Sequence, residues 1–440
     1  MNYDLNELVD YERGVIDRRI FWDQEIYELE LERIFARAWL FVAHESQIKS
    51  FGDFVTTYMG EDAVIVARAK DGSINVMLNS CPHRGNRVCF AGEGTVRSFV
   101  CNYHGWAFGL DGALNGMPNN ELYDNTPGFD KADWGLHRAR VETYQGLVFA
   151  TFDKEAPSLE EYLGDFRWYL DAILDPDGHG TEFLPGTTRS VLSCNWKFPA
   201  DNFVGDIYHG LWTHLGGVEP TLGKFGGVTV DNEKSYQASV NGHGWEFSVL
   251  NNFGNAATMG DKEIIRYMRA HEEAMIERLG EVRAKMWGAV SSAAIFPNFA
   301  FLPGYFTFRT FQPKGPLETE LHAWTLVPSS LSDELRDRWR TGTMRTFSPS
   351  GMLEMDDGEN WEHATQINAG HVTRQQKLCY GMSPQGQVTD GSLPGTVHRG
   401  QLTDANQRLY FKRWLEFMSA PTWNDIPMAP SMSDQVEAAE

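Results

Sequence analysis

The chain lacks long hydrophobic runs and has little positive charge. No run of about 18 or more apolar residues occurs, so no membrane-spanning helix is expected. The net charge is -22, from 38 Lys and Arg against 60 Asp and Glu. Because nucleic acids and anionic membranes bind clustered cations, this balance argues against both as partners. The acidic N-terminus has no basic region followed by an apolar run, and we expect a cytoplasmic protein.

Cysteine is scarce, and a nucleotide-binding signature is missing. The five cysteines are an odd number in a chain of 440 residues and suggest no disulfide framework, which fits a reducing compartment. No G-x-G-x-x-G motif follows a strand-like run, so NADH and flavin should bind other proteins. The 42% of hydrophobic residues is enough for substantial cores, and the length allows two or three domains.

Two of the cysteines each stand close to a histidine. Cys81-Pro-His83 is followed by Cys101-Asn-Tyr-His104. Two thiolates and two imidazoles suit a [2Fe-2S] cluster in which two histidines replace two cysteines on one iron. The same donors could hold a structural Zn²⁺, but zinc fingers pair Cys with Cys and His with His. The pattern therefore favours an electron-accepting cluster.

The region around this motif has the pattern of short strands. Residues 63–67 and 73–78 are β-rich runs joined by a Lys70-Asp71-Gly72 turn, and Asp111-Gly112 repeats the turn signal. We expect an all-β domain over residues 39–155. Before it, Asp23 is a candidate N-cap for a helix, and residues 1–38 should form a helical segment that packs on the catalytic domain.

After residue 155 helical patterns return. They cover 158–174, 264–287 and 332–347, whereas 300–311 and 320–327 resemble strands. We predict an α+β catalytic domain over 156–440, with an antiparallel sheet covered by helices. Residues 222–260 are rich in Gly and Asn and indicate a long loop, a candidate lid over a site.

A second group of metal-ligating residues follows residue 200. On a helix Asn202, Asp206 and His209 share one stripe. His214 stands five residues after His209, which is about 500° of helical rotation, so the two imidazoles diverge on a continuous helix. A chelating pair requires the helix to bend or end near Gly210.

The acidic turn that begins at Glu354 could supply a third ligand through Asp356 or Asp357. Two histidines and one carboxylate on one face of iron form the facial triad of non-haem Fe(II) oxygenases. Alternatively, the histidines are hydrogen-bonded core residues and the aspartates cap a helix.

Several motifs in order resemble one family, the large subunit of bacterial Rieske non-haem iron aromatic-ring-hydroxylating dioxygenases of the biphenyl, naphthalene and phenylpropanoate type. The resemblance covers nearly the whole chain. It rests on C-P-H-R-G from Cys81, C-x-Y-H-G-W from Cys101, N-W-K from Asn195, the segment from Asn202 to His214, and D-D-G-E-N-W from Asp356.

The resemblance implies a role for each matched residue. Cys81, His83, Cys101 and His104 would bind the cluster, and His209, His214 and Asp357 the mononuclear iron. Asp206 would link an iron histidine to His104 of the partner subunit. The substrate pocket would consist of Asn202, Phe203, Ile207, Gly210, Phe347 and Leu353.

The resemblance also implies trimers of large subunits, usually with three small β subunits (α3β3), and electrons from NADH through a reductase and a ferredoxin. The reaction would add both atoms of O₂ to an aromatic ring as a cis-dihydrodiol. No Lys or Arg occurs among the matched pocket positions, which favours a neutral mono- or polycyclic hydrocarbon. The alternatives are an aromatic carboxylate of the phenylpropanoate or phthalate type, monooxygenation, and a non-enzymatic electron carrier or zinc-stabilised binding module.

Overall fold

The computed structural model describes residues 4–210, 212–222, 232–250, 254–384, 386–389 and 391–430. The chain divides into two compact units, one of Phe35–Leu159 and the other of Met1–Ile34 with Glu160–Glu440. These boundaries lie at 34/35 and 159/160. The sequence suggested boundaries at 38/39 and 155/156, so each differs by four residues. Among the described residues, no helix combines the length and the apolar character that crossing a membrane requires.

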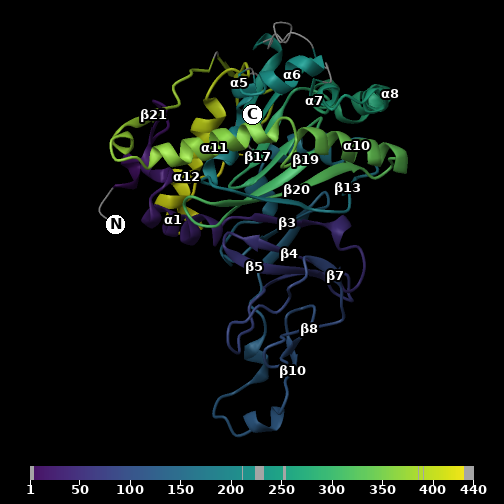
Figure 1. The fold of residues 1–440 in the computed structure, drawn as a ribbon, viewed down its shortest axis with the longest axis vertical. Coiled ribbons are helices and arrows are strands. Elements are labelled where there is room, and N and C mark those ends of the chain that lie inside the picture. The colour runs from purple at the N-terminus through teal and green to yellow at the C-terminus, as the bar shows by residue number, and fades with distance from the viewer. Residues whose placement is uncertain are drawn as a thin grey trace, which may run out of the picture. The chain divides into compact units, whose positions relative to one another are not determined.

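The smaller unit is built from short antiparallel strands, as predicted (Figure 1). The expected turn is present, because the Asp71 side chain accepts a hydrogen bond from the Ser73 N–H and Gly72 has a φ of 87°. The strands form three sheets: β3 (Leu40–His44), β11 (Arg140–Tyr144) and β12 (Leu147–Thr151); β4 (Asp53–Met59), β5 (Asp62–Arg68), β6 (Ile74–Leu78) and β7 (Glu93–Thr95); β8 (Phe99–Val100), β9 (Ala107–Phe108) and β10 (Leu114–Gly116).

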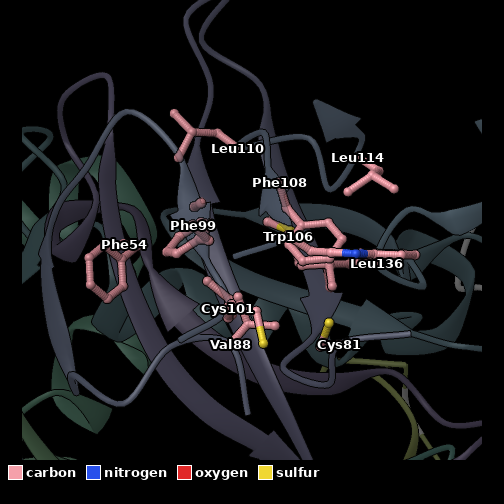
Figure 2. Packing of buried hydrophobic residues seen from close by; sticks show 13 residues of the cluster. Phe54, Cys81, Val88, Phe99, Cys101, Trp106, Phe108, Leu110, Leu114 and Leu136 are labelled. Carbon is pink, nitrogen blue, oxygen red and sulfur yellow. The ribbon is translucent and has the colours of Figure 1, made fainter. Parts of the chain in front are cut away.

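One hydrophobic cluster underlies the two Cys/His loops of this unit. Phe54, Phe99, Trp106 and Phe108 pack together, and each is at most 4% exposed. Figure 2 shows Cys81 and Cys101 at one edge of the cluster. The packed aromatic side chains therefore form the base on which both Cys/His loops rest.

The larger unit is organised around one antiparallel sheet of ten strands, as predicted (Figure 1). The strand order is β13-β20-β19-β18-β17-β16-β15-β23-β22, and β14 also pairs with β20. Their bounds are β13 Thr181–Phe183, β14 Thr188–Leu192, β15 Ser235–Val240, β16 His243–Ser248, β17 Ser292–Ile295, β18 Phe299–Leu302, β19 Thr307–Pro313, β20 Thr319–Pro328, β22 Gln387–Val388 and β23 Thr396–Arg399.

Helices cover both faces of this sheet. Trp245 points to one face and contacts Phe166 and Tyr169 of α3. On the other face Phe311 contacts Phe203 of α4 and Trp361 of α11. The helices are α1 Gln24–Glu30, α2 Leu159–Leu163, α3 Phe166–Leu174, α4 Lys197–Gly205, α5 Ile207–Gly210, α6 Leu215–Leu222, α7 Gly254–Thr258, α8 Lys262–Leu279, α9 Glu281–Met286, α10 Asp333–Thr346, α11 Glu354–Asn368 and α12 Ala405–Ser419.

Two expectations were wrong in part. Residues 222–260 are not one long loop, because β15 and β16 form a hairpin within the main sheet. The stretches 223–231 and 251–253 lie outside the described residues. The N-terminal segment is not only helical: β1 (Val9–Asp10) and β2 (Val15–Asp17) precede α1, and β2 pairs with β21 (Lys377–Cys379). Asp23 does cap α1, which continues as a π-helical turn, Leu31–Phe35.

Candidate metal centres

The helix that carries the first histidine is interrupted twice. Helix α4 ends at Gly205, Asp206 has φ -118° and ψ 55°, and α5 is a single turn that ends at Gly210. The chain then turns through His214 into α6. The predicted ending near Gly210 is present, and the further break at Asp206 was not expected. Together they allow two histidines five residues apart to face each other.

His209, His214 and Asp357 form a nearly equilateral triangle of donor atoms. The two Nε2 atoms are 3.2 Å apart, and Asp357 Oδ1 lies 3.1 Å from His209 Nε2 and 3.2 Å from His214 Nε2. With metal–ligand bonds of about 2.1 Å, neighbouring ligands of an octahedral ion lie about 3.0 Å apart, so the triangle matches one octahedral face. These three residues could hold a metal ion.

The other ring nitrogens of both histidines have partners that favour a metal-binding tautomer. His209 Nδ1 lies against the backbone carbonyl of Asp206, 3.5 Å from the Asp206 carboxylate and 3.2 Å from Asn202 Nδ2. His214 Nδ1 is 3.4 Å from Asp356 Oδ2. A proton held on each Nδ1 leaves the Nε2 lone pair free for a metal.

The electrostatics of the triangle suit a cation. Burial lowers the pKa of His209, but the carboxylates of Asp357 and Asp206 outweigh it and raise that pKa well above its usual value. Burial raises the pKa of Asp357, but both imidazoles lower it below its usual range. Asp357 is 3% exposed, so its charge requires a positive partner.

Two of the expected pocket residues, Phe203 and Phe347, both contact Arg309, which the sequence analysis did not identify. The Arg309 guanidinium lies 5.0 Å from the ring centre of Phe203 and 5.2 Å from that of Phe347. Arg309 is fully buried and pairs with Glu354 at 3.1 Å. A charged residue within a strand-like stretch was the signal available in the sequence.

The remaining pocket positions lie near the triangle or beside a cavity. A Cβ at Gly210 would contact Ile207 and His214 at 3.6 and 4.0 Å, and Leu353 directly precedes α11, on which Asp357 lies. Phe347 lines a cavity of about 240 Å³ between α10 and strands β19 and β20; among the described residues, its other walls include Thr307, Ala323, Thr325, Arg340, Thr343 and Met344.

The two Cys/His loops of the smaller unit share one backbone design. The Cys81 N–H donates to the Asn86 carbonyl at 2.8 Å and the Gly85 N–H to the Cys81 carbonyl at 2.8 Å. The Cys101 N–H likewise donates to the Trp106 carbonyl at 2.8 Å, and the Gly105 N–H to the Cys101 carbonyl at 2.9 Å. Both glycines have positive φ, 74° and 73°, which closes each loop tightly.

The loops direct their donors toward a shared site. The Cys81 and Cys101 thiols lie close to each other, and backbone N–H groups of each loop lie near its sulfur atom. The imidazoles of His83 and His104 lie 4.4 Å apart between ring centres. His83 Nδ1 is buried and has no hydrogen-bond partner among the described residues. An unpartnered buried nitrogen beside two buried thiols fits an iron–sulfur cluster.

Comparison with known families identifies the class. The profile of the ring hydroxylating alpha subunit (catalytic domain) matches residues 159–385, and that of the Rieske [2Fe-2S] domain matches residues 38–129. The chain therefore belongs to the family of ring-hydroxylating alpha subunits.

Individual relatives are similar over nearly the whole chain. The chain is 40% identical to the benzene 1,2-dioxygenase alpha subunit of Pseudomonas putida, covering 96% of this chain and 95% of the relative. It is 41% identical to the biphenyl 2,3-dioxygenase alpha subunit of Rhodococcus jostii, covering 96% and 92%. The crystal structure of a naphthalene 1,2-dioxygenase variant bound to phenanthrene has a TM-score of 0.91 at 31% identity and covers 97% of both chains.

These comparisons settle the class of protein. The chain is an enzyme subunit of the ring-hydroxylating dioxygenase class, with a Rieske [2Fe-2S] domain and a catalytic domain for non-haem iron. A zinc-stabilised binding module, which the Cys and His donors left open, does not agree with the Rieske match.

Proposed function

We propose that this protein is the terminal oxygenase subunit that cis-dihydroxylates a neutral mono- or polycyclic aromatic hydrocarbon. The reaction consumes the arene, O₂, two electrons that originate from NADH, and two protons, and both oxygen atoms enter the dihydrodiol. The observation that carries the proposal is the triangle of His209, His214 and Asp357 in a chain about 40% identical to relatives named for benzene and biphenyl.

The charges around the aromatic pocket residues support a hydrocarbon over an aromatic acid. Arg309 lies beside Phe203 and Phe347, but its charge is already paired with Glu354. Releasing it to bind a carboxylate would leave Glu354 buried without a partner, which is costly. Lys234 is exposed and ends the turn Asn232–Lys234, and Lys224 lies outside the described residues. A neutral ring requires none of these charges.

The proposed metal ligands are His209, His214 and Asp357, and the proposed cluster ligands are Cys81, His83, Cys101 and His104. When bound, the mononuclear iron would supply oxygen activation and the cluster would supply an electron.

The residues of the chain prepare this site by orientation and exclusion of water. Asp356 and the Asp206 carbonyl hold the protons on the Nδ1 atoms of the two imidazoles. Phe203, Phe347 and Leu353 are each at most 6% exposed and suit a flat apolar ring. Asn202, Ile207 and Gly210 complete the proposed pocket on the side of α4 and α5.

The proposed assembly is α3β3, with a small β subunit, and its electron donors are a ferredoxin and a reductase in the cytoplasm. The relatives are named as alpha subunits of dioxygenases, which supports a second kind of subunit. We further propose that Asp206 connects His209 to His104 of the partner subunit and so carries the electron route. The Asp206 carboxylate lies 3.5 Å from His209 Nδ1 and is 30% exposed, so it could reach both.

Product identification tests the proposal. The purified oxygenase, with reductase, ferredoxin and NADH, is incubated with benzene, biphenyl, naphthalene, phenanthrene, phthalate and 3-phenylpropanoate. We expect cis-dihydrodiols from at least one hydrocarbon and none from the two acids. Turnover restricted to the acids would overturn the substrate assignment, and monohydroxylated products alone would overturn the reaction type. Stoichiometric zinc without acid-labile sulfide would overturn the cluster.

A further inference from the structure

The break between α4 and α5 leaves backbone groups without helical partners. In a continuous helix the carbonyls of Val204 and Gly205 would accept hydrogen bonds from residues four positions later. Here the His209 N–H instead donates to the Asp206 side chain at 3.3 Å. Unpaired polar groups are costly when buried, and Val204 and Gly205 are buried. The break therefore needs substitute partners.

Three fully buried side chains from the sheet and α12 surround the break, and two of them supply these partners. Asn406 Nδ2 donates to the Val204 carbonyl at 2.9 Å, and Gln237 Nε2 donates to the Gly205 carbonyl at 2.8 Å. The Glu246 carboxyl lies close to the Ile207 N–H, and its Oε2 has no hydrogen-bond partner among the described residues. Each of the three side chains is 0% exposed. Asn406 and Gln237 therefore replace hydrogen bonds that the helix gives up, and Glu246 places a polar group beside the first N–H of α5.

The three side chains are themselves held in place. Gln237 Oε1 accepts from the Asn406 N–H at 2.9 Å, and Gln237 Nε2 also donates to the Thr403 carbonyl at 2.9 Å. Ser292 Oγ donates to Glu246 Oε1 at 2.9 Å. A Cβ at Gly205 would lie 3.0 Å from Asn406 Nδ2 and 3.3 Å from Gln237 Nε2, so the backbone fits closely against the network.

We propose that Gln237, Glu246 and Asn406 are positioning residues that fix the break before α5 and thereby hold His209 opposite His214. None of the three is in the proposed ligand set or the substrate pocket. The inference rests on the proposed iron site and adds to it the part of the fold that shapes the site. Burial raises the pKa of Glu246 to about 8, with a further increase from the Asp206 charge, and so favours a neutral carboxyl beside the break.

The test measures metal affinity in variants of the holoenzyme. Gln237→Leu removes a hydrogen-bond donor to the break and Glu246→Leu removes the polar group beside the Ile207 N–H, whereas Glu246→Gln keeps a polar group there. Gln312→Met is the control, because Gln312 is a buried amide of the same sheet on the face away from α4. Mononuclear iron is removed and Fe(II) is titrated back, and binding is followed by the electron paramagnetic resonance of its nitric oxide adduct.

Removal of an outer partner of a metal ligand typically costs about 10- to 100-fold in affinity. We expect such a loss of Fe(II) affinity and a changed resonance for Glu246→Leu and Gln237→Leu, with near-normal values for Glu246→Gln and Gln312→Met. Circular dichroism of each variant verifies that the larger unit is folded, because the cluster belongs to the smaller unit. Unchanged Fe(II) affinity in both Leu variants, or equal losses in Glu246→Gln and Glu246→Leu, would overturn the inference. Absence of mononuclear iron from the wild type would instead overturn the proposed function.

Discussion

Two adjacent aspartates at the start of α11 have different surroundings. Asp357 is buried within the triangle of donor atoms, whereas the side chain of Asp356 is 39% exposed and approaches only His214 Nδ1. Sequence spacing could not separate them, because either could reach a metal from an acidic turn. The family resemblance selected Asp357, and the helical geometry gives a physical reason, since α11 directs Asp357 inward and Asp356 outward.

Replacing each aspartate by alanine should therefore give unequal results. Asp357→Ala should lose the mononuclear iron and all product formation, because the only carboxylate of the triangle is removed. Asp356→Ala should lose about tenfold or less in activity, since it removes one long contact to His214. Metal analysis and product yield, with the cluster spectrum as a folding control, measure both. Loss of iron in Asp356→Ala but not in Asp357→Ala would reverse the assignment.

A change of charge at Asp206 tests the proposed electron route to the mononuclear iron. Asp206→Asn removes the charge but keeps the shape of the residue at the helix break. If the carboxylate carries the electron route, the variant should keep a reducible cluster and bound iron, yet form product more than about 100-fold more slowly, beyond the usual cost of losing an outer partner. Single-turnover kinetics measure the transfer. Near-normal rates with iron retained would exclude this role.

Phe347 packs against Tyr305 at 4.8 Å between ring centres and lines the cavity beside α10. Phe347→Val should open space there and let an asymmetric arene turn, and a displacement of about 1 Å can cost on the order of a hundredfold at one ring position. We expect a changed regioisomer ratio on biphenyl or phenanthrene with unchanged iron content. An unaltered ratio would place Phe347 outside the substrate pocket.

A buried ion pair fixes the beginning of helix α4 against helix α1. Lys197 Nζ lies 2.6 Å from Glu30 Oε1 of α1, and both side chains are 0% exposed. The indoles of Trp196 and Trp414 also donate to Glu30, at 2.9 and 2.7 Å. The Asn195-Trp196-Lys197 motif thus anchors the helix whose far end leads to His209.

Breaking this pair should destabilise the catalytic unit. Lys197→Met leaves Glu30 charged and buried, which typically costs about 3–5 kcal/mol. The double variant Glu30→Gln with Lys197→Met should recover much of that loss, because the amide oxygen still accepts from the indoles. Chemical denaturation measures both free energies. Lys285→Met, in an exposed pair with Glu281, is the matched control, with a change of about 0–1 kcal/mol expected.

Several helices and hairpins could be predicted from the sequence, and others could not. The hairpin at Asp71-Gly72 and the helices near 158–174, 264–287 and 332–347 were predicted because periodicity and turn residues agree locally. The β15–β16 hairpin was missed, although Asn241-Gly242 is a strong turn signal and both residues have positive φ, 52° and 81°. Its strands are buried on both faces, so polar and apolar residues do not alternate.

Contacts between residues far apart in the sequence shape the proposed metal site, and local sequence patterns do not predict such contacts. Gln237 and Glu246 lie beside the break before α5 although they are about 30 to 40 residues away in sequence, and Arg309 of β19 pairs with Glu354 of α11, so no short sequence window contains either arrangement. By contrast, the cluster donors occur in two short motifs and could be predicted. The sequence therefore predicts ligand pairs that lie close together along the chain, but it does not predict the distant residues that support them.

Asp17 joins the N-terminal segment of the larger unit to Lys377 of β21, and this contact predicts a pH dependence. Burial raises the pKa of Asp17, but hydrogen bonds from Arg19 and Lys377 outweigh it and lower the pKa to about 2, from 3.8. The contribution to stability is therefore complete above about pH 5 and is lost as the pH falls from about 4 toward 2.

Asp17→Asn should lower the free energy of unfolding at pH 7 by about 1–2 kcal/mol, because Lys377 is partly exposed and solvent weakens the pair. The difference from wild type should shrink as the pH falls below 4. Asp10→Asn is the control, since its pair with Arg13 in the same N-terminal hairpin is exposed. A difference that stays constant from pH 7 to pH 3 would contradict the role of the charge.

The positions of the three triangle residues along the chain have a consequence for handling the protein. His209 and His214 flank the end of α5, and Asp357 stands in α11, 143 residues after His214. An ion held by all three is a cross-link that closes this long stretch of chain, and binding that favours the native state adds to its stability. Iron-depleted preparations should therefore be cut faster by proteases around α5 and α11, and storage with Fe(II) should protect them.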